Sequence, residues 1–118
     1  MLEASQYITT VINSKTAITT ALAGGLSWEI SASDVEKPFM NFNLLEQPGP
    51  SKDSGATYTV SFFVFADTLT ESATIGGIIK NEIKTDTSLN WKFVRASNGY
   101  TSNEASEAFI ELVYNFNL

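Results

Sequence analysis

The alternation of apolar and polar side chains is sharpest over Thr57–Ala66, where it predicts a β-strand. One face of this strand is apolar throughout and consists of Tyr58, Val60, Phe62, Val64 and Ala66. The other face changes from hydroxyl to aromatic side chains, in the order Thr57, Thr59, Ser61, Phe63 and Phe65. We therefore expect a central strand with one fully covered face. On the other face, we expect a helix or a neighbouring subunit to cover Phe63 and Phe65.

Two segments have the apolar period of about 3.6 residues that is typical of an amphipathic helix. The first is Ser5–Leu22, with a candidate break around Asn13–Thr16. The second is Thr70–Lys84, which follows the central strand almost directly and has Thr68 or Thr70 as its candidate cap.

A pair of glycines, Gly76 and Gly77, lies inside the second predicted helix. Each costs about 1 kcal/mol relative to alanine in a helix interior. Close packing of this helix on the sheet is the preferred interpretation of the pair, and close contact with a neighbouring subunit is the alternative.

Four other segments alternate like strands, namely Leu26–Ala32, Phe39–Leu45, Asn90–Ala96 and Glu107–Leu118. Unbroken alternation in the third of them places Trp91, Phe93 and Arg95 on one face. Arg95 then either contacts a partner or lays its aliphatic stem along the rim of the sheet. The second interpretation is preferred.

Two segments rich in turn-forming residues connect these strands. The first is a long predicted loop that contains Gln47, Pro48, Gly49, Pro50, Ser51, Lys52, Asp53 and Ser54. The second begins with Asn98, Gly99 and Tyr100, because Asn-Gly is a common turn dipeptide. Long surface loops commonly carry function, so both are candidate interaction segments.

The predicted element order is α-β-β-β-α-β-β over a single domain, residues 1–118. Strands and helices are segregated along the chain, which favours the α+β class. We expect a mostly antiparallel sheet of about five strands, with two helices packed on one face.

Composition narrows the possible functions. The chain has no histidine and no cysteine, which removes the commonest general base, the thiolate nucleophile and the usual zinc ligands. We therefore expect no enzyme, no metal and no cofactor. The net charge of −6 argues against a surface that grips phosphate backbones. We also expect no secretory signal and no membrane contact, since no apolar run approaches the ~20 residues of a membrane helix.

Three segments together resemble one known family. They are the Pro-Phe strand Lys37–Phe42, the strand-to-helix junction Tyr58–Ile83 and the closing strand Glu107–Leu118. This layout is similar to the tail terminator (tail completion, minor head–tail joining) proteins of long-tailed bacteriophages. The chain departs from that family at Gly76-Gly77, where its members usually carry alanine and leucine, and in the abundance of threonine in the first helix.

The resemblance implies a structural protein of the virion tail or neck, assembled in the host cytoplasm. Proteins of this family form a ring, usually a hexamer, that caps the tail tube, ends tail polymerisation and joins the tail to the head connector. The implied partners are further copies of the chain, the tail tube protein and the head-completion or connector protein. Genomic DNA would pass through the lumen without specific binding, which acidic walls favour because they do not neutralise phosphates.

Given this resemblance, we expect the loops Gln47–Gly55 and Asn98–Ser106 to contact the tube or a neighbouring subunit. Two alternatives stay open. One is another neck or tail tube component. The other is a small-ligand-binding cup, whose cavity would be lined by Phe62, Phe65, Trp91 and Phe93.

Overall fold

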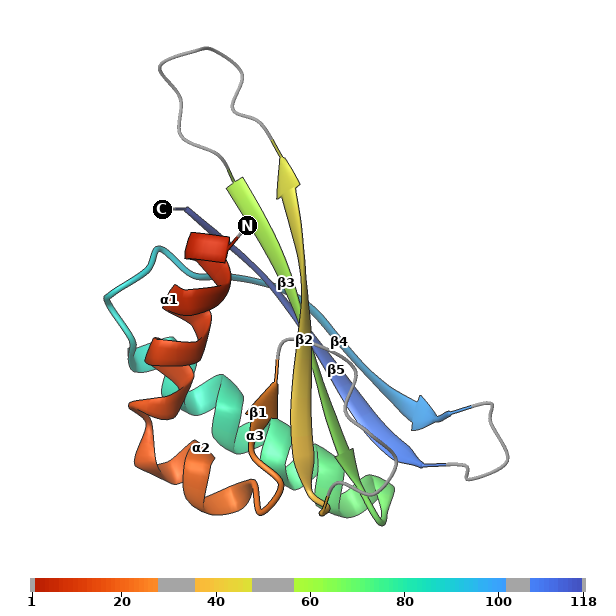
Figure 1. Cartoon of the computed structure of the whole chain (residues 1–118). Coiled ribbons are helices and arrows are strands. Elements are labelled where there is room, and N and C mark those ends of the chain that lie inside the picture. Colours follow the sequence, from red (N-terminus) through yellow and green to blue (C-terminus); the bar gives the residue numbers. More distant parts are fainter. Residues whose placement is uncertain (1, 28–35, 48–56, 102–106, 118) are drawn as a thin grey trace, which may run out of the picture.

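A five-stranded sheet organises the residues that the structure describes, and three helices lie on one of its faces (Figure 1). The structure is a computed structural model, and it describes residues 2–27, 36–47, 57–101 and 107–117. The elements, in chain order, are α1 (Leu2–Asn13), α2 (Thr16–Ala21), β1 (Leu26–Ser27), β2 (Phe39–Gln47), β3 (Thr57–Ala66), α3 (Leu69–Thr85), β4 (Lys92–Tyr100) and β5 (Ala108–Asn117).

Strand β3 is central, as its alternation predicts, and it has the predicted bounds. The strand order in the sheet is β1-β2-β3-β5-β4. Strand β3 pairs antiparallel with β2 from Thr57 to Phe65 and with β5 over all of its residues. Strand β1 runs parallel to β2, so the sheet is mixed. The predicted α+β class and five strands are confirmed.

The core lies between the helices and the apolar face of the sheet. Every second residue of β3 is buried, and the neighbouring strands contribute residues in register with them. The fully buried side chains that fill this layer include Ile8, Ile12, Ile18, Met40, Phe42, Val60, Phe62, Val64, Ile79 and Leu112. Burial of these side chains is the main favourable contribution to folding.

The first predicted helix is two helices, so the described residues form three helices where two were expected. It breaks inside the predicted segment Asn13–Thr16. Helix α1 closes with bonds from the Ser14 amide to the Thr10 carbonyl (3.0 Å) and from the Lys15 amide to the Ile12 carbonyl (3.1 Å). Lys15 is extended, with φ −92° and ψ 98°, and α2 starts at the next residue. Both helices bury apolar side chains in the core, α1 through Ile8 and Ile12 and α2 through Ile18.

Helix α3 is capped by Thr68, the first of its two predicted caps. The Thr68 hydroxyl oxygen accepts a hydrogen bond from the Glu71 amide at 3.1 Å. The two glycines of α3 have different surroundings. A Cβ atom added to Gly76 would lie 2.7 Å from Cδ1 of Ile110 in β5. A Cβ atom added to Gly77 would meet nothing within 4 Å. Close packing on the sheet therefore explains Gly76 and does not explain Gly77.

Strand β4 contains a β-bulge that the sequence pattern conceals. Phe93 pairs with Tyr114 and Arg95 pairs with Val113, so Val94 is an extra residue between two adjacent pairs. A bulge of this kind reverses the facing of every later side chain. Phe93 thus lies on the helix-covered face and Arg95 on the opposite one. The prediction that they share a face was wrong, because it assumed unbroken alternation.

The predicted turn at Asn98-Gly99 was also wrong, because β4 continues through Tyr100. Asn98 pairs with Ile110, Gly99 with Phe109 and Tyr100 with Ala108. A Cβ atom added to Gly99 would lie 3.7 Å from the Phe109 ring, an ordinary van der Waals distance, so the pairing does not require glycine here. Long-range pairing with β5 therefore overrides the local turn preference.

We expect Gly76→Ala to lower the free energy of unfolding by about 1 kcal/mol. Overpacking against Ile110 costs about 1–3 kcal/mol, and alanine restores about 1 kcal/mol of helix propensity. Gly77→Ala is the matched control and should raise the free energy of unfolding by up to about 1 kcal/mol. Urea denaturation of both variants measures the difference.

Making the same two substitutions in an Ile110→Val background tests whether Ile110 is the side chain that an added Cβ atom at residue 76 contacts. Valine lacks the Cδ1 atom that lies closest to an added Cβ, so Gly76→Ala should cost less in that background than in the wild type. Equal stabilisation by the two alanine substitutions would contradict the assignment.

Candidate functional site

A groove of about 1080 Å³ lies between the second half of α3 and the start of β4. The connection between them, residues 86–91, closes one side. The side chains that matter for the argument are Gly77, Lys80, Lys84, Trp91, Phe93 and Tyr114. The groove lies where α3, which packs mainly on β3 and β5, makes less contact with β4, whose residues are mostly exposed.

Aromatic rings form the sheet side of the groove. The Trp91 and Phe93 rings each meet Tyr114 edge-on, with centroid distances of 5.7 and 5.3 Å. The Tyr114 ring is buried, and this burial raises the pKa of its hydroxyl to about 12. Phe93 is 48% exposed, although it lies on the helix-covered face. The groove therefore presents a large apolar side chain to whatever enters it.

Two lysines of α3 form the opposite side. The Lys80 ammonium lies 4.5 Å from the centroid of the Phe93 ring, a cation–π contact. Within the described residues, neither Lys80 nor Lys84 takes part in an ion pair. Asp86 also lines the groove, but its carboxylate is paired with Lys15. The groove combines apolar rings with a basic rim.

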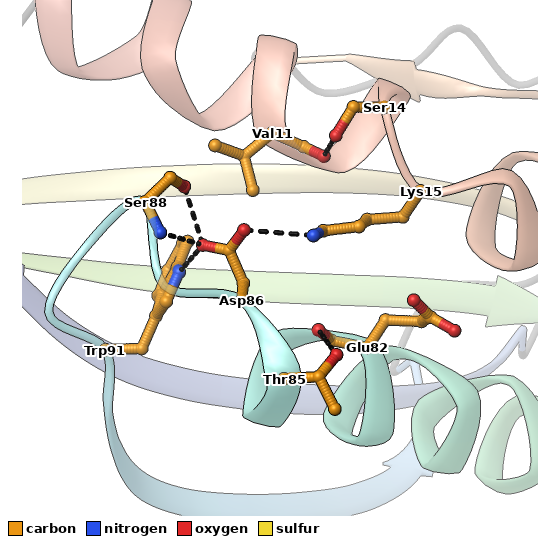
Figure 2. Close-up of polar contacts among 8 residues, drawn as sticks. All are labelled: Val11, Ser14, Lys15, Glu82, Thr85, Asp86, Ser88 and Trp91. Carbon is orange, nitrogen blue, oxygen red and sulfur yellow. Dashed lines mark hydrogen bonds and ion pairs between the residues drawn. The ribbon is translucent and has the colours of Figure 1, made fainter.

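A polar cluster around Asp86 holds the groove's connecting segment in place (Figure 2). One carboxylate oxygen of Asp86 lies 2.9 Å from the Lys15 ammonium, at the break between α1 and α2. The other accepts hydrogen bonds from the indole N–H of Trp91 at 2.8 Å and from the Ser88 hydroxyl at 2.7 Å. Asp86 thus joins the end of α3, the α1–α2 corner and the aromatic side of the groove.

The pKa of the Asp86 carboxyl reflects these contacts. Burial alone would raise its pKa, since only 7% of the side chain is exposed. The hydrogen bonds from Ser88, Lys15 and Trp91, with the charge of Lys15, outweigh burial and lower the pKa to about 2. The carboxylate is therefore ionised across the physiological range, and the cluster is structural.

The helix-free face of the sheet carries a second apolar patch, which we call the open-face cluster: Phe39, Phe63, Phe65 and Phe109. Phe65 stacks on Phe39 with 5.0 Å between ring centroids, and the Phe109 ring lies 6.2 Å from Phe65. Phe63 and Phe65 are half-buried. No helix of the described residues covers them, and cover by a neighbouring subunit stays a prediction.

Most of the rest of the open face is polar, as the change along β3 predicts, although Leu45 and Val113 also lie on it. The Thr57 hydroxyl donates to the Asn117 side chain at 2.9 Å, and the Thr59 hydroxyl donates to Asn115 at 2.7 Å. Arg95 lies on this face with its guanidinium 3.9 Å from the Glu111 carboxylate. Its side chain is 62% exposed, so the pair contributes little to stability.

The predicted interaction residues do not form one site. Gln47 is the exposed last residue of β2, and the positions Pro48–Ser54 lie outside the described residues. Phe63, Phe65, Arg95 and Gly99 lie on the open face, whereas Asn98 and Tyr100 share the opposite face of β4 with Phe93. Of the predicted set, Gly77 alone lines the groove, while Gly76 is buried against the sheet.

Sequence reasoning missed Lys80 and Lys84 as site residues. Their signal was available, because both follow Gly77 on α3 at helical spacings of three and seven residues. The ligand-binding cup predicted from aromatic residues is also not formed as expected. Phe62 is fully buried and Phe65 lies on the other face of the sheet. Of the four residues predicted for the cup, Trp91 and Phe93 line the groove.

The described residues contain no group of three His, Cys, Asp or Glu side chains placed to share a metal ion. None of their helices combines the length and the apolarity required to cross a bilayer.

Comparison with known proteins finds similarity in structure and none in sequence. No family model matches the sequence, and no curated protein matches it. Among solved structures, that of the gp17 protein of bacteriophage SPP1 matches with a TM-score of 0.60 over 98% of this chain and 89% of that one. This chain shares its fold with a bacteriophage protein. At 14% sequence identity the likeness is one of fold alone.

We expect Asp86→Asn to lower the free energy of unfolding by about 2–3 kcal/mol at neutral pH. That figure follows from a carboxyl pKa that falls from 3.8 in the unfolded chain to about 2 in the folded one. Because the folded pKa is depressed, the contribution is complete above about pH 5 and is lost as the pH falls through 4 to 2. Acid titration of stability by circular dichroism measures it.

The matched control is Lys15→Met, which removes the ion pair and keeps the hydrogen bonds from Ser88 and Trp91. It should cost less than Asp86→Asn and keep part of the acid dependence. Stability profiles of wild type and Asp86→Asn that run parallel between pH 2 and 5 would show that Asp86 does not stabilise the fold in this way.

Proposed function

We propose that this protein is a structural component of a long-tailed phage virion. In this proposal it forms a ring that caps the tail tube, ends tail polymerisation and joins the tail to the head connector. The observation that carries the proposal is the fold, shared over nearly the whole chain with a bacteriophage protein. The resemblance to tail terminator proteins supports the same assignment independently, since it rests on sequence layout.

The distribution of apolar surface supports an assembling protein. Beside the groove, β4 forms an edge of the sheet and exposes Phe93, Val94 and Tyr100 at 48%, 45% and 58%. Apolar residues on an exposed edge strand favour contact with another chain. The open-face cluster lies on the other side of the sheet, where Phe63, Phe65 and Phe109 are half-buried and Phe39 is buried. A subunit with two unlike surfaces suits the head-to-tail contacts that close a ring.

The negative net charge of the chain is compatible with DNA passing through the proposed ring. With a net charge of −6, a ring of such subunits has walls that repel phosphates and so let DNA slide without binding. The tail tube protein and the head connector are the partners that this proposal requires at the two ends of the ring.

A small-ligand-binding protein is the second candidate, because the groove has an aromatic side and a volume near that of typical ligand pockets. The two proposals differ in oligomeric state. The ligand-binding candidate needs only one subunit, because the groove lies within a single chain, whereas a tail terminator functions as a ring.

Light scattering coupled to size-exclusion chromatography, followed by negative-stain microscopy, tests the proposal. We expect a mass of several subunits, closed rings with a central channel and no stacking into tubes. A monomer at high protein concentration would favour the ligand-binding candidate. Rings that stack into long tubes would favour a tail tube component instead.

The role in the tail has its own test. Interrupting the coding sequence in the phage or prophage genome that carries it should give filled heads without attached tails and free tails of irregular length. Supplying the intact protein in trans should restore joined particles. Normal virions from the interrupted genome would exclude this role.

A further inference from the structure

We propose that the groove between α3 and β4 receives helix α1 of a second copy of this chain. The inference rests on the proposed ring and names the two surfaces that meet in it. It follows from the chemistry of the groove and from a complementary stripe elsewhere on the same subunit.

The groove requires an occupant that is apolar and acidic. Its aromatic side exposes Phe93, and its α3 side carries Lys80 and Lys84 without ion-pair partners among the described residues. Opposite charges across an interface steer association and select the partner. Gly77 leaves open space on the helix, since nothing lies within 4 Å of its added Cβ atom. That space admits the backbone or a large side chain of an entering element.

Helix α1 offers a surface of the required kind. Its exposed stripe consists of Leu2, Glu3, Gln6, Tyr7 and Thr10, which recur at helical spacing. Leu2 is 64% exposed and Tyr7 is 47% exposed, although both are large and apolar. The helix contains Glu3 and no lysine or arginine. It therefore supplies apolar side chains and a negative charge, which complement the rings and lysines of the groove.

The two surfaces cannot satisfy each other within one subunit. The other side of α1 is buried in the core through Ile8 and Ile12, so the stripe faces away from its own sheet. No residue of α1 lines the groove. Contact between the stripe of one copy and the groove of the next is head-to-tail, and such contacts close into a ring when the rotation allows. This geometry leaves each copy with one groove filled and one stripe buried.

Charge exchange tests the pairing in the full-length protein. Glu3→Lys alone, and the double change Lys80→Glu/Lys84→Glu alone, should each raise the protein concentration needed for half-assembly by about tenfold or more. Combining all three changes in one chain should restore assembly, because the signs are then exchanged across the same contact. Lys92→Glu is the control for charge, since Lys92 is exposed on β4 and does not line the groove; it should leave assembly unchanged.

Cross-linking tests the geometry. The chain has no cysteine, so Tyr7→Cys and Gly77→Cys each introduce a single thiol. Mixing the two purified variants and adding a short bismaleimide should give a linked pair that neither variant gives alone. Mixing Tyr7→Cys with Asn43→Cys, an exposed position on β2, should give none.

The outcomes separate this inference from the proposed ring. A wild-type protein that stays monomeric, together with no linked pair from the mixed Tyr7→Cys and Gly77→Cys variants, overturns both. A ring whose assembly ignores the charge changes, or whose Tyr7→Cys links equally to both partners, overturns only the pairing of α1 with the groove. In that case the groove would be free for a different protein, such as one at the end of the tube. Restoration by the exchanged charges, together with the specific link, establishes the contact.

Discussion

Strand β3 is hydrogen-bonded to β2 on one side and to β5 on the other, and its alternate side chains are buried under the helices. This arrangement constrains everything else. The helices can cover only one face, because that is where the continuous apolar surface lies. The face left open is polar near Thr57 and aromatic near Phe65, and the β4 edge stays uncovered. The surfaces available for assembly are therefore those that packing of the core leaves uncovered.

Charged side chains have different roles at two places beside the groove. At Asp86, a buried carboxylate is matched by Lys15, Ser88 and Trp91, so its charge stabilises the fold. At Lys80 and Lys84, positive charge is left without an acidic partner among the described residues. Paired charge tends to be structural, whereas unpaired charge beside an apolar surface suits recognition. The two sites lie on the same groove, one as its support and the other as its rim.

The sequence predicted most of the fold because periodicity reports burial directly. Strand β3, the class, the strand count and the helix cap at Thr68 all follow from local pattern. The bulge at Val94 and the continuation of β4 through Asn98-Gly99 do not, since both depend on pairing with β5, which lies distant in sequence. The groove was missed for the same reason. The groove forms where α3, the connection after it and two strands come together in the fold. The sequence pattern of any one of these segments therefore does not predict it.

The bulge also affects how relatives of this chain are to be recognised. From Arg95 onward, the inward and outward positions of β4 are exchanged relative to a regular strand that starts at Lys92. A related chain without the extra residue would carry its apolar positions one place earlier. Sequence alignment by side-chain character alone would then place polar residues against apolar ones over the second half of this strand. A one-residue gap opposite Val94 restores the correspondence, and profiles built for distant relatives of this fold need to allow for it.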